Sequence, residues 1–253
     1  MDARHIFTRG DSDLISSLNA YEGWRKAKSA HSGLEFCRKN RIGDQAMSQV
    51  EEQKIQLLVY FVDAGLLILE SQERGTLNKA RMGAGRGSTF YEIPHRYNQP
   101  ISDRALSSII AMAFYPRILT REGKGWRNVY TNQVVLVTSR SINHGNIRGA
   151  RWLSFHEAMQ NRSGNLNVFE TSTIPEFALA TLLGDAEFNF FAGVMVLDSG
   201  KLKLSVQNWR ELMAIKVLRD RISEILDICY KSPGDVQGEE ERKWVDFFLQ
   251  LEA

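Results

Sequence analysis

Basic and aromatic side chains alternate between residues 117 and 130, on either side of a glycine-containing turn, Glu122–Gly125. The side chains concerned are Arg117, Arg121, Lys124, Trp126, Arg127 and Tyr130. Proteins that bind single-stranded nucleic acids combine cations, which meet the phosphates, with aromatic rings, on which the bases stack. The hairpin therefore predicts such a contact. Trp126 and Tyr130 fit a second interpretation equally well, as core residues of a small barrel.

A second group of basic and aromatic residues follows at Arg140, Arg148, Arg151 and Trp152, with the same two interpretations. The whole chain carries a net charge of only +2. Positive charge is nevertheless concentrated from Arg74 to Arg127, where ten Lys or Arg face three acidic residues, a net charge of +7. This concentration favours a phosphate-bearing partner, although charges on solvated loops would give the same count.

Other chemistries find little support in the residues. No G-x-x-x-x-G-K-[ST] string and no Asp-Glu-Ala-His box occurs, and the Gly-rich string Gly83–Ser88 lacks the lysine and follows no strand. His31 and Cys37 are too sparse for a metal site. No G-x-S-x-G elbow is present. We therefore expect no ATP hydrolysis and no catalytic or metal site in this chain, and an enzyme of unrecognised type is the weakest hypothesis.

Composition is that of a soluble globular protein: 253 residues, 43% hydrophobic and 25% charged. No apolar run approaches the ~20 residues of a membrane span, and Met1–His5 does not open a secretory signal. The two cysteines, Cys37 and Cys229, cannot build a disulfide framework. The sequence predicts an intracellular protein, nuclear or cytoplasmic, with no membrane partner.

The first part of the chain reads as a helical bundle over residues 1–72. Asp11–Asp13 precedes a helical apolar pattern that runs to Trp24, a short helix is expected at Leu34–Arg41, and Asp44 opens a longer one. The apolar face of that longer helix is predicted to hold Met47, Val50, Ile55, Leu58, Phe61 and Val62. Residues 73–100 lose this periodicity and predict a basic, Gly-rich loop or insertion.

In the second part of the chain, the spacing of apolar residues changes from a helical period to that of short strands. Ser102 and Asp103 predict the start of a helix that ends before Pro116. Strands are then expected at residues 128–138, 190–197 and 202–206, a short helix at 178–183 and a long one at 207–230. Short strands closed by a helix favour a small barrel over a βαβ sheet. The expected fold is α+β, with a barrel domain over 101–233 and an acidic tail or helix over 234–253.

Several motifs resemble the C-terminal region of DEAH-box RNA helicases, in the same order. Leu18–Trp24 (LNAYEGW), Phe36–Asn40 (FCRKN) and Gln56–Leu58 (QLL) are similar to the family's helical "ratchet" region. Met112–Ile118 and Thr171–Asp185 are similar to segments of its OB-fold. The resemblance covers roughly residues 13–233. It departs from the family in the long basic stretch 74–96, in Asp185, which replaces a usual glycine, and in the unmatched tail.

The resemblance implies a ratchet-like bundle followed by an OB-fold that grips the backbone of single-stranded RNA. It implies contacts from Arg117, Lys124 and Arg127, from the hydroxyls of Thr171 and Ser172, and from Arg38 and Lys39 on the ratchet side. With the basic and aromatic groups above, the predicted RNA-binding residues are Arg117, Arg121, Lys124, Trp126, Arg127, Arg140, Thr171, Ser172, Arg38 and Lys39.

It also implies that the RecA-like motor domains and the winged helix, with their ATP and Mg²⁺, belong to a larger protein within which this chain starts. In the same family the OB-fold region also serves as a docking surface for activators. A second hypothesis is therefore a protein-interaction module for helicase activators or ribonucleoprotein partners, with 74–100 and the acidic tail as the partner sites.

Overall fold

The computed structural model describes residues 3–83, 90–145, 149–162, 164–232 and 238–252, which form two compact units. The barrel unit comprises Met1–Asn19, Ile101–Ser223 and Trp244–Ala253, and the helical unit comprises Ala20–Pro100 and Glu224–Lys243. Most of the Gly-rich string 83–88 and Arg148 of the second basic group lie outside the described residues.

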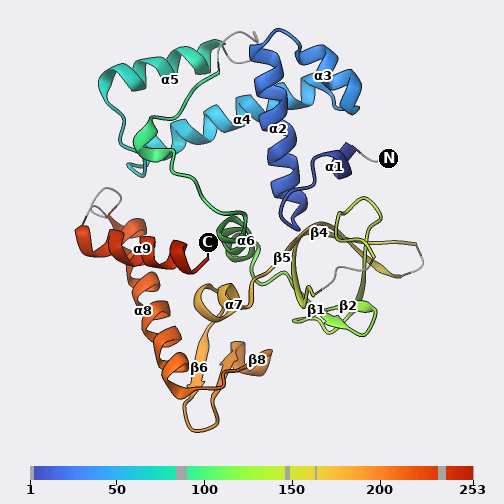
Figure 1. Ribbon diagram of the computed structural model, residues 1–253, viewed down its shortest axis with the longest axis vertical. Helices are drawn as coiled ribbons and strands as arrows, with labels where there is room; N and C mark the ends of the chain where they lie inside the picture. The colour runs from blue at the N-terminus through green and yellow to red at the C-terminus, as the bar shows by residue number, and fades with distance from the viewer. Residues whose placement is uncertain (1–2, 84–89, 146–148, 163, 233–237, 253) are drawn as a thin grey trace. The chain divides into compact units, whose positions relative to one another are not determined.

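Five short strands form the barrel: β1 (Ile118–Glu122), β2 (Gly125–Asn128), β3 (Val134–Val137), β4 (Trp152–Gln160) and β5 (Leu166–Thr173). They close in the order β1-β2-β3-β5-β4, with β1 paired to β4 (Figure 1). Neighbouring strands are antiparallel except β3 and β5, which are parallel. A closed five-stranded barrel of this kind is OB-like. The predicted α+β fold with a small barrel is confirmed.

The interior of the barrel follows the two-residue period of its strands, since alternate side chains point inward. Its core consists of Leu119, Trp126, Val135, Val137, Leu153, Phe155 and Val168. Trp126 is only 5% exposed, so the core interpretation of this residue holds.

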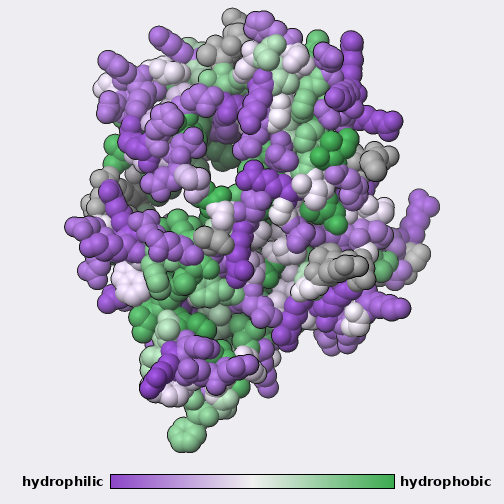
Figure 2. Space-filling view, in the orientation of Figure 1, coloured by the Kyte–Doolittle hydropathy of each residue, from purple (hydrophilic) through white to green (hydrophobic). Residues whose placement is uncertain are grey.

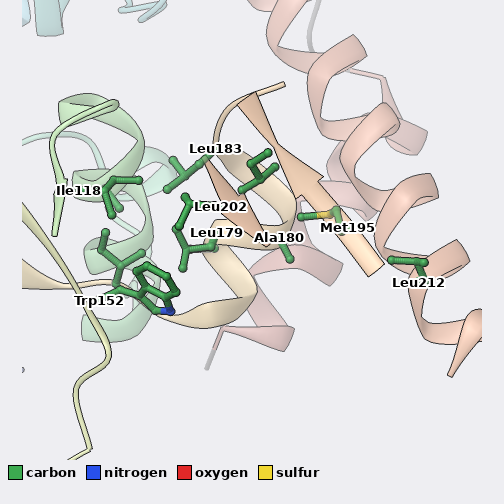
Figure 3. Packing of buried hydrophobic residues seen from close by; sticks show 12 residues of the cluster. Ile118, Trp152, Leu179, Ala180, Leu183, Met195, Leu202 and Leu212 are labelled. Carbon is green, nitrogen blue, oxygen red and sulfur yellow. The ribbon is translucent and has the colours of Figure 1, made fainter. Parts of the chain in front are cut away.

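A second, three-stranded antiparallel sheet lies in the barrel unit: β6 (Ala186–Asn189), β7 (Val194–Leu197) and β8 (Leu202–Ser205), with the 3-10 turn η2 (Asp198–Gly200) between β7 and β8. Three helices pack with it: α6 (Asp103–Phe114), α7 (Glu176–Leu182) and the start of α8 (Trp209–Lys231). The core that they share is continuous with the barrel. Figure 3 shows its members Ile118, Trp152, Leu179, Ala180, Leu183, Met195, Leu202 and Leu212.

Helix α6 begins where the sequence predicts. The Ser102 hydroxyl accepts a hydrogen bond from the Ala105 N–H at 3.0 Å, which satisfies one of the unpaired donors of the first turn. Helix α9 (Glu239–Leu251) occupies most of the predicted tail, and α1 (Ala3–Ile6) is a single short turn. In α9, Phe248 is buried and its ring stacks on Phe177 at 5.9 Å between centroids.

The helical unit contains the later part of α2 (Asp13–Ser29), together with α3 (Gly33–Asn40), α4 (Asp44–Asp63), α5 (Ser71–Gly83) and the 3-10 turn η1 (His95–Tyr97). One apolar cluster lies between α4, α5 and the chain after them, and consists of Ile55, Leu58, Val59, Val62, Leu69, Leu77, Ala80 and Tyr91. A second cluster joins Tyr21, Trp24 and Cys37.

Three details differ from the predictions. Helix α5 occupies part of the stretch predicted as a loop, because Leu77 and Ala80, one turn apart, are buried despite Gly75. In α4, Val50 and Phe61 are 43% and 47% exposed, so the inward face is narrower than the apolar spacing suggests. The strands after residue 185 form a sheet of their own and do not extend the barrel.

Among the described residues, no helix combines the length and the apolar character that crossing a bilayer requires. In the same part of the chain, no group of three or more His, Cys, Asp or Glu side chains is placed to hold a metal ion.

Candidate nucleic-acid interface

The outer face of β2 and β3 is the surface through which OB-folds bind oligonucleotides, together with the loops between strands 1 and 2 and between strands 4 and 5. Here Trp126 pairs with Val135 and points inward, so Arg127 and its partner Val134 point outward. Leu136 follows on the same outer side and is half-exposed. We call Arg127, Val134 and Leu136 the β2–β3 face.

The turn between β1 and β2 lies at one end of this face and the turn between β4 and β5 at the other. Because β2 runs antiparallel to β3, residue 125 lies beside residue 136, and β3 ends at the same end of the barrel as the first turn. Because β5 runs parallel to β3, Leu166 lies beside Val135, near the opposite end. The two loops that flank ligands in OB-folds are thus both present.

Lys124 and Arg140 are the exposed cations at the first end. Lys124 forms the β1–β2 turn, and Arg140 follows the end of β3 by three residues. Within the described part of the chain, no carboxylate lies within ion-pair distance of either side chain. Their charges are therefore free to meet phosphates. The register of the strands places both residues at the same end of the β2–β3 face.

Arg121 and Arg127 are engaged by the protein. The Arg121 guanidinium lies 5.2 Å from the centre of the Trp126 ring. The Nε of Arg127 lies 2.5 Å from a carboxylate oxygen of Glu122, and its Nη1 donates to the Asn132 carbonyl at 2.6 Å. The ion pair with Glu122 lowers the net charge that Arg127 offers to a ligand.

Arg117 stands apart from the other cations. It precedes β1, whereas Lys124 follows β1, so the two side chains mark opposite ends of that strand. The Arg117 guanidinium is exposed and donates to the His156 carbonyl. The structure therefore does not gather Arg117, Lys124 and Arg127 into one cluster.

Three predicted contact residues point into the protein. Trp126 is in the barrel core. Thr171 and Ser172 have 0% and 1% exposure. The Ser172 hydroxyl lies 2.6 Å from that of Ser12, and the Thr171 hydroxyl lies 2.9 Å from that of Ser141. In this arrangement none of the three can reach RNA, and we leave them out of the candidate interface.

Arg38 and Lys39 belong to the helical unit. Both are exposed in the last turn of α3, where cations also favour the negative end of the helix dipole. Tyr130, the other aromatic residue of the basic hairpin, is half-buried, and its hydroxyl donates to the Asp198 carboxylate. The aromatic stacking surface expected near the hairpin is thus absent among its described residues.

Two features of this surface were not predicted from the sequence. Arg162 is an exposed cation in the β4–β5 turn, at the second end of the β2–β3 face. Val134, Leu136 and Met159 are 59%, 50% and 60% exposed, and Asn167 pairs with both Leu136 and Met159 in one outward row. The four residues Val134–Val137 are all apolar, with no alternation of polar and apolar residues. Which of them point outward is therefore decided by strand register alone.

The fold and these cations define a class of protein: an OB-like barrel with a helical region, carrying positive charge on the loops that flank the β2–β3 face. No protein-family model matches the chain. In sequence it is similar to the DExH-box ATP-dependent RNA helicase DExH1 of Arabidopsis thaliana, with 25% identity over 241 residues, which is 92% of this chain and 22% of that protein.

A second similarity is to the DExH-box ATP-dependent RNA helicase DExH3 of Arabidopsis thaliana, with 32% identity over 66 residues, 26% of this chain and 6% of that protein. The resemblance predicted from the motifs is thus confirmed at the level of sequence: over most of its length the chain is similar to DExH-box RNA helicases. It spans about a fifth of the length of the first of these relatives.

Proposed function

We propose that the chain is an RNA-binding accessory region of a DEAH-type, ATP-dependent RNA helicase. Its task would be to hold the backbone of single-stranded RNA while motor domains translocate. One observation carries the proposal: an OB-like barrel whose first loop end presents Lys124 and Arg140 without carboxylate partners within the described residues. Similarity to RNA helicases over most of the chain supports the choice of RNA as the nucleic acid.

Contacts of this kind should be dominated by phosphate. The β2–β3 face has cations at both ends, Lys124 and Arg140 at one and Arg162 at the other, and no aromatic side chain among Arg127, Val134 and Leu136. Cation–phosphate contacts release counterions and carry no sequence information. Binding should therefore depend strongly on salt and tolerate any base sequence.

In this proposal ATP and Mg²⁺ belong to RecA-like domains of a full-length helicase. Those domains and a winged helix would be the chain's intramolecular partners, and a protein activator would be a further one. We assign no ATP chemistry to the described residues. A nuclear or cytoplasmic location remains a prediction.

The test is fluorescence anisotropy of a labelled single-stranded RNA, titrated with the chain at several salt concentrations. The variant K124A/R140A/R162A should bind more weakly, and its slope of log affinity against log salt should fall by about 2, since each phosphate contact on a single strand contributes about 0.7. An unchanged slope in this variant would remove the barrel from the RNA-binding surface.

A control variant removes the same charge from positions that a carboxylate already neutralises. Lys216, Lys231 and Lys243 each pair with an acidic residue one helical turn away, at 2.5, 3.0 and 2.8 Å. The variant K216A/K231A/K243A should keep the wild-type salt slope. If both triple variants lose affinity equally, net charge alone explains the binding.

The row Val134, Leu136 and Met159 favours a second candidate function, a surface that docks another protein. Three apolar side chains that are each at least half exposed make poor phosphate contacts but suit a protein partner. Retention of a partner protein at high salt, without retention of RNA, would support this alternative over RNA binding.

A further inference from the structure

The turn between β6 and β7 presents an aromatic side chain to solvent. Phe191 is 107% exposed, as open as in an extended peptide. Figure 2 shows apolar surface projecting at the lower end of the view, where Figure 1 places the turn after β6. A phenylalanine in this position contributes no burial to folding, so its whole ring is accessible to a ligand.

The turn that carries Phe191 is held in place on both sides. The Asn189 side-chain oxygen accepts from the Ala192 N–H at 3.0 Å, and the Gly193 carbonyl accepts from the Val206 N–H at 2.8 Å. Gly193 has φ +62°, and a Cβ there would lie 2.7 Å from the Val206 carbonyl oxygen. The ring is therefore presented by a fixed backbone and needs little ordering when it binds.

A second exposed aromatic residue belongs to the same end of the sheet. Strand β8 runs back toward the turn, since Ser205 pairs with Val194, and α8 begins four residues later at Trp209. Trp209 is 57% exposed. The Arg210 guanidinium lies 5.6 Å from the centre of the Trp209 ring. An exposed indole with a cation beside it matches the combination that binds nucleotides.

Two cations lie on the elements that lead away from this end of the sheet. Lys203, in β8, and Arg210, in α8, are exposed, and within the described residues neither of them has a carboxylate at ion-pair distance. In β6, β8 and the first turn of α8 the exposed acidic side chains are Glu187 and Glu211, so cations and carboxylates are equal in number there. Protein-docking sites are contiguous apolar patches depleted of lysine. Single aromatic rings interleaved with unpaired cations are instead typical of surfaces for single-stranded nucleic acids.

We propose that the β6–β7 turn is a base-stacking contact for single-stranded RNA. In it Phe191 and Trp209 stack on bases, and Lys203 and Arg210 meet the adjoining phosphates. This inference rests on the proposed function, and it adds a contact to the bases that the barrel lacks. The stacking would be tolerant of sequence, because every base has a π-face.

The test uses a single-stranded oligoadenylate that carries one 2-aminopurine, whose fluorescence falls when the base stacks on an aromatic ring. Full chains of wild type, F191A, F191L and F191W are compared by anisotropy and by 2-aminopurine fluorescence. F191A should lose about 5- to 150-fold in affinity, the range for one base–aromatic stack, and should lose quenching. Its salt slope should stay that of the wild type, because no phosphate contact is removed.

The matched substitutions separate stacking from simple apolar contact. F191W keeps a ring and should bind as the wild type does, whereas F191L keeps apolar area without a ring and should resemble F191A. Wild-type affinity in F191A, or in F191L, would overturn the proposal, the latter in favour of an apolar contact with a protein. If the wild type itself binds no RNA, the proposed function fails and this inference fails with it. Binding that responds to K124A/R140A/R162A but not to F191A defeats the inference alone.

Discussion

The buried carboxylate of Asp13 accepts a hydrogen bond from the backbone N–H of Thr171 at 2.9 Å, across 158 positions of the chain. Its other oxygen accepts from the Ile142 N–H, also at 2.9 Å. Next to it, Ser12 begins α2, since its hydroxyl accepts from the Ile15 N–H, and it bridges to Ser172. The first residues of α2 are thus fastened to β5 and to the loop after β3.

Asp13→Ala should destabilise the protein by about 2–4 kcal/mol, because two backbone donors lose a charged acceptor in a site that water does not reach. The change is measured by urea denaturation followed by circular dichroism. Asp11→Ala is the matched control, since Asp11 is exposed and its hydrogen bonds within the described residues go through its backbone carbonyl, which accepts from Thr173 and Asn143 and is kept in the variant. It should shift stability by less than about 0.5 kcal/mol. Equal losses in both variants would contradict the role assigned to the Asp13 carboxylate.

Gly184 occupies a position that a side chain cannot share. Its φ is +60°, and a Cβ there would lie 2.5 Å from the Tyr115 hydroxyl and 2.8 Å from a carboxylate oxygen of Asp198. Gly184→Ala should cost about 3 kcal/mol or more, from left-handed strain together with overpacking. Gly145→Ala tests strain alone, because φ is +86° with nothing within 4 Å of the added Cβ, and should cost only about 1–2 kcal/mol. The stabilities of both variants are compared by thermal denaturation. If Gly184→Ala loses no more stability than Gly145→Ala, overpacking at Gly184 does not contribute to the loss.

Burial raises the pKa of the Tyr130 phenol to about 12. Its hydroxyl donates to Asp198 and lies 2.5 Å from that of Tyr115. An unfolded tyrosine has a pKa near 10, so between about pH 10 and 12 the folded protein keeps a proton that the unfolded chain has lost. Stability should be unaffected by this group below about pH 10 and should fall as the pH rises toward 12.

The measurement is the difference in tyrosinate absorbance between wild type and Tyr130→Phe during an alkaline titration. The difference should titrate with a midpoint near 12, and the variant should lose less stability than the wild type over the same interval. A difference that titrates near pH 10 would show that the phenol is hydrated in the folded protein.

The sequence predicted most of the helices and the barrel, because their signals are local. Ser102 marks the start of α6, and the switch from a helical period to short apolar runs marks the strands. The sequence did not decide whether the Trp126 side chain points into the barrel or outward. In a short strand this direction follows from the register with β3, and the residues around Trp126 do not determine that register.

Thr171 and Ser172 show a second limit. In the sequence they are two hydroxyls in a segment that resembles part of the OB-fold of DEAH-box RNA helicases, and in the structure their partners are Ser141 and Ser12. Contacts over 160 positions depend on topology, which a local pattern does not contain. Phe191 is the converse case: FNFFAG looks like a strand segment, and only the turn at Gly193 shows that its ring is in solvent.

Trp24 and Trp209 form a matched pair for testing burial. Trp24 is 1% exposed, its indole N–H donates to the Asp44 carboxylate at 2.8 Å, and its ring meets Phe90 edge-on at 5.6 Å between centroids. Trp24→Ala should cost about 3–5 kcal/mol, as for other large buried aromatic residues. Trp24→Phe keeps most of the ring but removes the indole donor to Asp44, which then keeps only its ion pair with Lys28 at 3.5 Å among the interactions of the described residues, and it should cost about 1–2 kcal/mol.

Trp209→Ala is the control, because an exposed indole contributes little to folding, and its effect on stability should stay within about 0.5 kcal/mol. Urea denaturation followed by circular dichroism compares the three variants. A loss of stability in Trp209→Ala as large as that in Trp24→Ala would mean that the Trp209 indole is buried in solution. It would then be unable to stack on RNA, so this stability measurement also bears on the contact proposed for the β6–β7 turn.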